Sequence, residues 1–192
     1  DPNEPGLWVN PAWQPGTPGT FAVLLGCSAY PHLAGGRAPA QETFGLGQLR
    51  VSALTAYEIF RWLTSHYHIS GCPLALCWLL LSPTDAELAY APGMAAHLTA
   101  PTLAHCTQAL RQWHSRMSTL PQSAAEASRA LFFFSGHGLE VHQEQQILLP
   151  CDYLAPPGTH WNDAISTENL THGLASLQVP KQFFFLDACR ND

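Results

Sequence analysis

The sequence is poor in positive charge and has no long apolar run. Its 192 residues include 8 Lys and Arg against 14 Asp and Glu, which gives a net charge of −6. Nucleic acids and anionic membrane surfaces bind positively charged proteins, so we expect neither as a direct partner. The longest apolar block, Leu74–Leu81, is too short to span a bilayer, which takes about 18 or more apolar residues.

The cysteines are few and scattered. The chain has 6 of them, without the dense spacing of a small disulfide framework, so we expect free thiols in a reducing, cytoplasmic compartment. With 46% hydrophobic and 10% aromatic residues, the chain has enough apolar surface for one globular domain with its own core.

Proline and glycine are concentrated in residues 1–19, which excludes a helix or a central strand there. We interpret this segment as an N-terminal arm or linker, followed by one domain over residues 20–192. Trp8 and Trp13 either pack the arm onto its own domain, which is the more common role of tryptophan, or dock a second domain. The chain opens with Asp1 and no secretory signal segment, so we expect a piece of a larger, multidomain protein.

Four apolar runs of strand length show no polar alternation, which indicates strands buried on both faces, as in a parallel sheet. They are Phe21–Gly26, Leu74–Leu81, Ala130–Phe134 and Gln182–Leu186. Helical patterns lie between them at Leu49–Leu63, Thr102–Met117 and Ser166–Leu177, with Thr99 or Thr102 and the run STEN as capping signals. This alternation predicts an α/β fold with an open, mostly parallel sheet and helices on both faces.

Two of these strands lead into chemically reactive residues. LFFFSGHG carries His137 between Gly136 and Gly138, and FFFLDACR carries Asp187 and Cys189. Ligands of an open α/β sheet bind beyond the carboxyl ends of its strands, and glycine permits a tight turn and a close approach to a substrate. If the two strands are neighbours, their tips together form one active site.

An imidazole beside a thiol can remove the thiol proton and later protonate a leaving amine. His137 and Cys189 therefore form a candidate dyad, with the backbone N–H groups of Gly138 and Cys189 as donors to an oxyanion. Either residue alone is more simply explained as a loop histidine or a buried packing cysteine. The matched strands and the glycines together favour the active site.

FFFSGHG and FFFLDACR resemble the strand-tip motifs of the caspase-like cysteine peptidases, which comprise caspases, metacaspases and their bacterial relatives. The caspase histidine precedes the cysteine by about 50 residues. FAVLLGCSAY and LLPCDYL also resemble the family's first strand and the segment between its two catalytic strands, so the resemblance covers residues 20–192. It implies that His137 is the general base and acid, Cys189 the nucleophile and Gly138 an oxyanion donor.

Asp187 occupies a position where caspases have glutamine and where metacaspases and clostripain-like relatives have aspartate. In those relatives the aspartate lines the pocket for Arg or Lys before the cut bond, so the resemblance implies a basic preference. A carboxylate that ends a buried apolar strand also needs a cation or hydrogen-bond donors, and Ser135 would line the same pocket. The alternative is that Asp187 pairs with Arg190 or another internal arginine. The metacaspase pattern has a second acid at the start of the first helix, where GQLRVSA carries Arg50 instead.

We expect no metal or other cofactor. Metacaspases often hold calcium with acids that precede the catalytic strand; Asp152 and Asp163 are present, but the expected paired acids read STEN here. Calcium dependence is therefore not supported. The run HYHISGCPLALC (His66–Cys77) contains two histidines and two cysteines, yet its spacing matches no strong zinc pattern.

The chain resembles the large-subunit portion of such a peptidase, because it ends soon after Cys189. In the family, a small-subunit segment or chain completes the sheet. We therefore expect a cysteine endopeptidase that cuts protein or peptide substrates through an acyl-enzyme, in a regulated assembly with a regulatory domain or activator. Two alternatives stay open: a catalytically silent scaffold or binding module, and a small-molecule thiol hydrolase or transferase on the same sheet.

Overall fold

The structure is a computed structural model that describes residues 4–140, 146–157 and 163–188. Its strands are β1 (Leu7–Val9), β2 (Thr20–Cys27), β3 (Leu74–Ser82), β4 (Arg129–Gly136), β5 (Gly138–Glu140), β6 (Gln146–Leu148), β7 (Ile165–Ser166) and β8 (Lys181–Ala188). Its helices are α1 (Ser52–Ser65), α2 (Asp85–Tyr90), the 3-10 helix η1 (Pro92–His97), α3 (Leu103–Ser118), α4 (Gln122–Ala127) and α5 (Thr167–Ala175).

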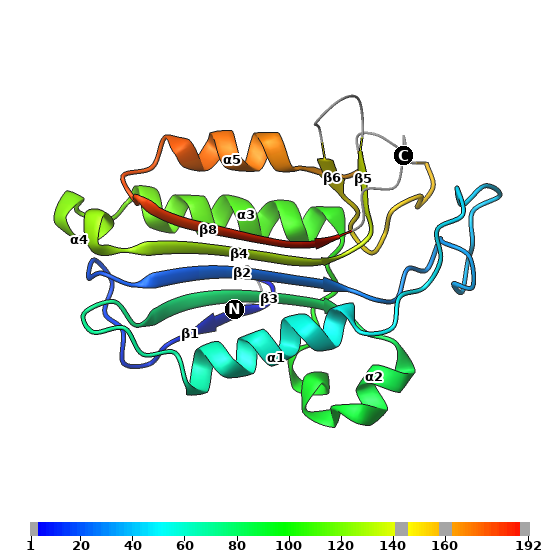
Figure 1. The fold of residues 1–192 in the computed structure, drawn as a ribbon, viewed down its shortest axis with the longest axis horizontal. Coiled ribbons are helices and arrows are strands. Elements are labelled where there is room, and N and C mark those ends of the chain that lie inside the picture. Colours follow the sequence, from blue (N-terminus) through cyan, green and yellow to red (C-terminus); the bar gives the residue numbers. More distant parts are fainter. Residues whose placement is uncertain (1–3, 141–145, 158–162, 189–192) are drawn as a thin grey trace.

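A five-stranded sheet in the order β1-β3-β2-β4-β8 forms the centre of the molecule (Figure 1). The strands β3, β2, β4 and β8 run parallel, and only β1, at one edge, is antiparallel to its neighbour. This confirms the expected open, mostly parallel sheet. The sequence patterns do not predict the second sheet, β5-β6-β7, because strands of two or three residues are too short to show a period.

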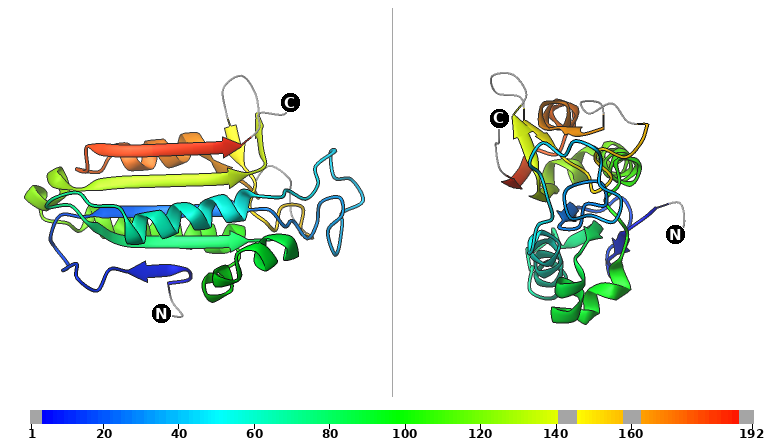
Figure 2. Two further views of the ribbon diagram at one scale, coloured as in Figure 1. Left: turned by 60° about the horizontal axis from the view of Figure 1, so that its bottom comes forward. Right: turned by 90° about the vertical axis from the view of Figure 1, so that its right-hand side faces the viewer.

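Helices cover both faces of the central sheet (Figure 2). On one face, Trp113 of α3 is fully buried and its Nε1–H donates to the carbonyl of Phe21, 2.9 Å away. On the other face, Phe60 and Leu63 of α1 belong to a separate apolar cluster. The two faces therefore have two cores, which share the sheet as their common wall.

No residue of β8 is buried, so the expectation that each predicted strand is buried on both faces is wrong for this strand. That expectation holds for β2, which is buried along its whole length. In β8, Phe184 packs against Phe132 on the α3 face, but Phe183 and Phe185 are 45% and 52% exposed on the α1 face. They are exposed because α1 packs over β2, β3 and β4. An apolar run does not reveal whether a further element covers it.

Two of the expected capping residues are confirmed. The hydroxyl of Thr102, not that of Thr99, accepts a hydrogen bond from the N–H of His105 and begins α3. The hydroxyl of Ser166 accepts one from the N–H of Asn169 and begins α5. Both caps are local in sequence, which is why the pattern predicts them.

The helix α1 begins later than expected, at Ser52, because its cap comes from distant residues. The N–H of Ala53 donates to the hydroxyl of Ser28, 2.9 Å away. The N–H of Leu54 donates to Oε1 of Glu87, 3.0 Å away. These partners attach the start of α1 to the carboxyl edge of the sheet.

In its described part, the N-terminal arm packs onto its own sheet. Its strand β1 pairs with the edge strand β3, and the rings of Trp8 and Phe60 lie 6.2 Å apart. The rings of Trp13 and Phe21 lie 5.7 Å apart. The two tryptophans are thus anchors on the chain's own core, the first of the two roles considered.

Candidate active site

The two strands that carry the candidate dyad are neighbours, as expected. In the parallel pair β4–β8, Ser135 lies opposite Asp187, and Gly136 lies opposite Ala188. His137 directly follows Gly136 in the sequence. Cys189 directly follows Ala188 but lies outside the described residues, as does Arg190. The described part of the site is therefore the histidine side of the dyad and the strand that leads to the cysteine (Figure 1).

The imidazole of His137 is held in one tautomer. Its Nε2 lies 2.7 Å from the carbonyl oxygen of Gly47. A carbonyl only accepts hydrogen bonds, so Nε2 carries the hydrogen and the neutral ring keeps its lone pair on Nδ1. A ring in this state can take a proton at Nδ1 while Nε2–H stays bonded to Gly47.

Burial keeps this imidazole neutral. His137 is only 9% exposed. Burial lowers its pKa below the ordinary value of 6.5, and the hydrogen bond to Gly47 acts in the opposite direction. The lowered pKa means that the ring is unprotonated near neutral pH, as a general base must be.

Tyr30 holds the backbone beside the imidazole. The N–H of His137 donates to the Tyr30 hydroxyl, 2.9 Å away, and this hydroxyl donates to the carbonyl of Leu149 at 3.3 Å. The two rings lie 5.0 Å apart. Burial raises the pKa of Tyr30 well above its ordinary value, with a further contribution from Cys27. The phenol therefore stays neutral and can both accept and donate.

Gly136 makes room for Tyr30, which corrects the interpretation of this glycine as a turn that lets a substrate approach. A Cβ at this position would lie 2.7 Å from the Tyr30 hydroxyl oxygen, and Gly136 is not among the described glycines with positive φ. It is the last residue of β4, and the absence of a side chain allows the phenol to reach the N–H of His137.

The N–H of Gly138 is left out of its strand pairing. Gly138 lies opposite Leu148, and the N–H of Leu149 donates to the carbonyl of His137, 2.9 Å away. This bond lies beside the pair of Gly138 and Leu148. The pair is therefore of the non-hydrogen-bonded type in the antiparallel ladder. The Gly138 N–H therefore points away from the ladder, and no hydrogen bond from it to another described residue is found.

Ser135 and Asp187 form a hydrogen bond across the two strands. The hydroxyl of Ser135, which is 1% exposed, donates to Oδ2 of Asp187 at 2.8 Å. Asp187 itself is exposed, so the argument that it needs a cation because it is buried is wrong. Among the described residues, no arginine forms an ion pair with it. Arg190 lies outside the described residues, so the alternative pairing of Asp187 with Arg190 is not tested.

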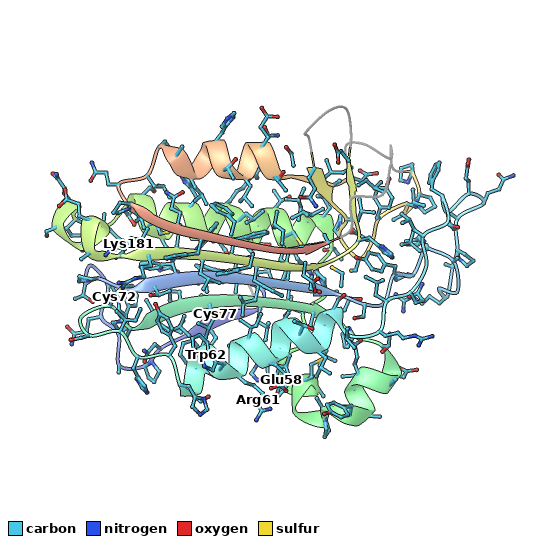
Figure 3. The ribbon with its side chains drawn as sticks, in the orientation of Figure 1. Glu58, Arg61, Trp62, Cys72, Cys77 and Lys181 are labelled. Carbon is cyan, nitrogen blue, oxygen red and sulfur yellow. The ribbon has the colours of Figure 1, made fainter. Side chains whose placement is uncertain are left out.

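The residues considered as metal ligands serve other roles or lie apart. The carboxylate of Asp152 accepts from the N–H of Leu103 at 2.8 Å, at the start of α3. Cys77 is fully buried within β3, and Cys72 lies near the beginning of that strand (Figure 3). In the part of the chain that the structure describes, no group of three or more His, Cys, Asp or Glu could hold a metal ion.

Within the described residues, no helix is long and apolar enough to cross a membrane.

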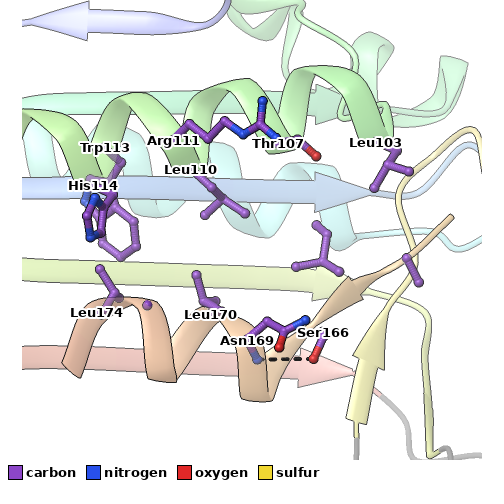
Figure 4. A pocket seen from close by; sticks show the side chains of 13 residues that line it. Leu103, Thr107, Leu110, Arg111, Trp113, His114, Ser166, Asn169, Leu170 and Leu174 are labelled. Atoms are coloured by element: carbon purple, nitrogen blue, oxygen red, sulfur yellow. Dashed lines mark hydrogen bonds between the residues drawn. The ribbon is translucent and has the colours of Figure 1, made fainter. Parts of the chain in front are cut away.

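A hollow lies away from the strand tips, between α3 and α5 (Figure 4). It measures about 570 Å³, and Leu110, Leu170 and Leu174 provide much of its apolar lining. Arg111 and His114 also line it, but neither His137 nor Ser135 does. This hollow is therefore separate from the candidate active site.

Comparison with known proteins settles the family. The family model of the caspase domain, Peptidase C14, matches residues 20–192. The chain belongs to the caspase domain family. One similar protein, named "Probable protease", comes from a Desulfuromonadales bacterium and is 30% identical over 148 residues. The match covers 74% of this chain and 16% of that protein, so this chain spans only a small part of its relative's length.

Two parts of this caspase domain's site were not predicted from the sequence. The carbonyl of Gly47 is a backbone group, and every residue type has one, so no sequence signal marks it. Tyr30 lies in FAVLLGCSAY, the run that resembles the family's first strand. Its position just beyond that strand was the available signal, because side chains there reach the carboxyl edge of the sheet.

Proposed function

We propose that this caspase domain is the catalytic part of a cysteine endopeptidase, with His137 as general base and acid and Cys189 as nucleophile. The observation that carries the proposal is the hydrogen bond from His137 Nε2 to the Gly47 carbonyl, which leaves Nδ1 as the proton acceptor. Further support comes from the pairing of β4 with β8, the strand that leads directly to Cys189.

In the proposed reaction, Nδ1 of His137 takes the thiol proton of Cys189, and the thiolate attacks the carbonyl carbon of the cut peptide bond. The new C–S bond moves an electron pair onto the carbonyl oxygen, where the N–H groups of Gly138 and Cys189 donate to it. The imidazolium then protonates the leaving amine as the C–N bond breaks. A water molecule, deprotonated by His137, then attacks the thioester carbonyl. The C–S bond breaks, the acid product leaves, and the imidazolium returns its proton to the Cys189 thiolate. The bond to Gly47 stabilises the imidazolium whenever it forms.

We further propose that Asp187, with Ser135 behind it, recognises a basic residue before the cut bond. The bond from Ser135 to Oδ2 orients the carboxylate. Among the described residues no other hydrogen bond reaches this exposed carboxylate, so we expect Oδ1 to accept from a guanidinium or ammonium group of the substrate. Charge-assisted hydrogen bonds of this kind are shorter and about twice as strong as neutral ones. The preference is therefore for Arg or Lys in the substrate.

The outer edge of β8 is the proposed site of a further polypeptide segment that completes the sheet, either a small-subunit segment or a separate chain. Among the described residues no strand pairs with this edge, and free strand edges are commonly covered. An apolar hollow of about 390 Å³ between α1 and β8 is lined by Trp62, Phe183 and Phe185. At the same hollow, Nη1 of Arg129 is buried without a hydrogen-bond partner within the described ranges.

The proposed function is tested with the longest natural form of the protein and fluorogenic peptides that place Arg, Lys or Asp before the reporter. Cleavage after Arg or Lys is expected, with its loss in both Cys189→Ala and His137→Ala. Activity should persist in the presence of a chelator, because the proposal needs no metal. Cleavage of none of the peptides, even with lysate as a source of activator, would favour the silent scaffold instead.

A further inference from the structure

The Gly47 carbonyl belongs to an irregular loop, although the proposed catalysis needs it in one place. Residues 28–51 contain no helix or strand beyond the isolated bridge of Ala34 with Gly47. Just before the bridge, Phe44 and Gly45 both have positive φ, at 51° and 72°. A backbone group in such a loop is fixed only if other contacts hold it, since loops are the more mobile parts of a fold.

The side chain of Gln48 supplies these contacts. Its Nε2 donates to the carbonyl of Tyr30 at 2.9 Å and to that of Ala34 at 3.1 Å. Its Oε1 accepts from the N–H of Tyr30 at 2.7 Å. One amide thus ties the residue next to Gly47 to the segment that leaves β2, through three hydrogen bonds.

Tyr30 connects the same amide to the other end of His137. Its backbone N–H and carbonyl both bond to Gln48, while its hydroxyl accepts from the N–H of His137. Gly47, covalently joined to Gln48, bonds to the imidazole of the same histidine. Gln48 therefore links the two groups that hold His137, one on its backbone and one on its ring.

From this arrangement we infer that Gln48 is a positioning residue for His137: it fixes the Gly47 carbonyl and so keeps the imidazole oriented with Nε2–H bonded and Nδ1 available. The catalytic consequence rests on the proposed peptidase function, but the orientation of the ring does not. The backbone bonds from Ala34 to the carbonyl of Leu46 and from Leu49 to the carbonyl of Ser28 do not involve the Gln48 side chain. We therefore expect variants at Gln48 to keep the fold while the Gly47 carbonyl becomes less firmly fixed.

Two variants separate the roles of the amide. Gln48→Ala removes all three bonds. Gln48→Glu keeps the shape and the acceptor, but it places carboxylate oxygens beside the carbonyls of Tyr30 and Ala34, which repel them. Gln122→Glu is the matched control, because Gln122 is exposed on α4 and bonds only to Glu126 among the described residues. Circular dichroism checks the fold of each variant.

The readout that does not depend on activity is the Nε2–H proton of His137, observed by NMR in protein with ¹⁵N-labelled histidine and assigned by its absence in His137→Gln. The buried hydrogen bond should protect this proton from exchange in the wild type and in Gln122→Glu. In both Gln48 variants the signal of this proton should disappear, because the proton exchanges with solvent. Equal protection in all of these proteins would overturn the inference, as would loss of the whole fold in both Gln48 variants.

The second readout is kinetic. With an active peptidase, both Gln48 variants should lose about 10- to 100-fold in kcat with little change in KM, because a misplaced catalytic group slows the chemical step. If the wild type is active and both Gln48 variants have the same kcat as the wild type, the positioning role of Gln48 is contradicted. If the wild type cleaves nothing, the proposed function fails, and the proton measurement still decides whether Gln48 positions His137.

Discussion

The imidazole of His137 and the carbonyl of Gly47 are joined by a hydrogen bond of 2.7 Å. It connects the tip of β4 to the loop before α1, two segments that lie far apart in the sequence. The bond selects the Nε2–H tautomer, and burial keeps the ring neutral. Together these two effects prepare Nδ1 to accept a proton before any substrate is present.

The lowered pKa of His137 predicts how the stability of the protein depends on pH. The unfolded state binds the proton with the ordinary pKa of 6.5, and the folded state binds it only at lower pH. Below 6.5 the unfolded state therefore carries more protons, so the contribution of His137 to stability is complete above that pH and falls as the solution is acidified.

Denaturant unfolding of the wild type and His137→Gln, between about pH 5.5 and 7.5, measures this contribution. The wild type should lose more free energy of unfolding on acidification than the variant, which retains the other histidines as an internal control. The same pH dependence in both proteins would mean that burial does not lower the pKa of His137.

The hydrogen bond between Ser135 and Asp187 predicts a change in substrate preference. Asp187→Asn should lower kcat/KM about 100-fold for peptides with Arg before the cut bond, because an amide cannot neutralise a guanidinium. Peptides with an uncharged residue there should lose much less. Ser135→Ala should have a smaller effect in the same direction. Glu126→Gln, an exposed change on α4, serves as the control. Equal losses for all peptides would assign Asp187 a structural role.

Glu87 is predicted to be important for stability although it lies outside the proposed site. Its carboxylate is 3% exposed and accepts hydrogen bonds from Ser28, Leu54 and the backbone and hydroxyl of Thr84. Glu87→Gln replaces one accepting carboxylate oxygen with an NH2 group, which cannot accept from these donors. The substitution should lower the free energy of unfolding by about 2–4 kcal/mol.

Glu58→Gln is the matched change on the surface. Glu58 pairs with Arg61 on the exposed side of α1 (Figure 3), and its loss should alter the free energy of unfolding by less than about 0.5 kcal/mol. Denaturant titrations of both variants make the comparison. Similar effects from the two substitutions would contradict the assignment of Glu87 as a cap of α1.

Two glycines are predicted to respond to alanine with opposite signs. A Cβ on Gly26 would lie 2.7 Å from the Cα of Ala53, so Gly26→Ala should push α1 from the sheet at a cost of about 1–3 kcal/mol. A Cβ on Gly173, within α5, has nothing within 4 Å, and Gly173→Ala should stabilise by about 0.5–1 kcal/mol. Thermal melts of the two variants give the sign of each change in stability. Destabilisation by both substitutions would contradict the open space around Gly173.

The parts of the fold that the sequence predicts are those with strong local signals. The four parallel strands and the caps at Thr102 and Ser166 follow from apolar runs, capping residues and alternation. The adjacency of β4 and β8 was a hypothesis based on the reactive residues at their tips. The exposure of Phe183 and Phe185 could not be predicted, because an apolar run does not show whether another element packs against it. The start of α1 was also missed, since its cap depends on residues distant in sequence.

The candidate site, like the fold, could be predicted from the sequence only in part. His137 stands out because it lies three residues past an apolar run and between two glycines. The Gly47 carbonyl and the Gln48 amide do not, because one is a backbone group and the other an ordinary polar side chain in a loop. Their role appears only when the chain brings the loop to the end of β4.

The reactivity of Cys189 is the sharpest test of the proposed dyad of His137 and Cys189. The other five cysteines are buried free thiols; burial raises the pKa of Cys27, Cys77 and Cys106, and burial with Asp152 raises that of Cys151 to about 12. The measurement is the rate of alkylation of each cysteine by iodoacetamide near neutral pH, mapped by mass spectrometry, in the wild type and His137→Ala. Cys189 should react first, and its rate should fall at least about 10-fold without the imidazole of His137. An equal rate in the two proteins would contradict the dyad.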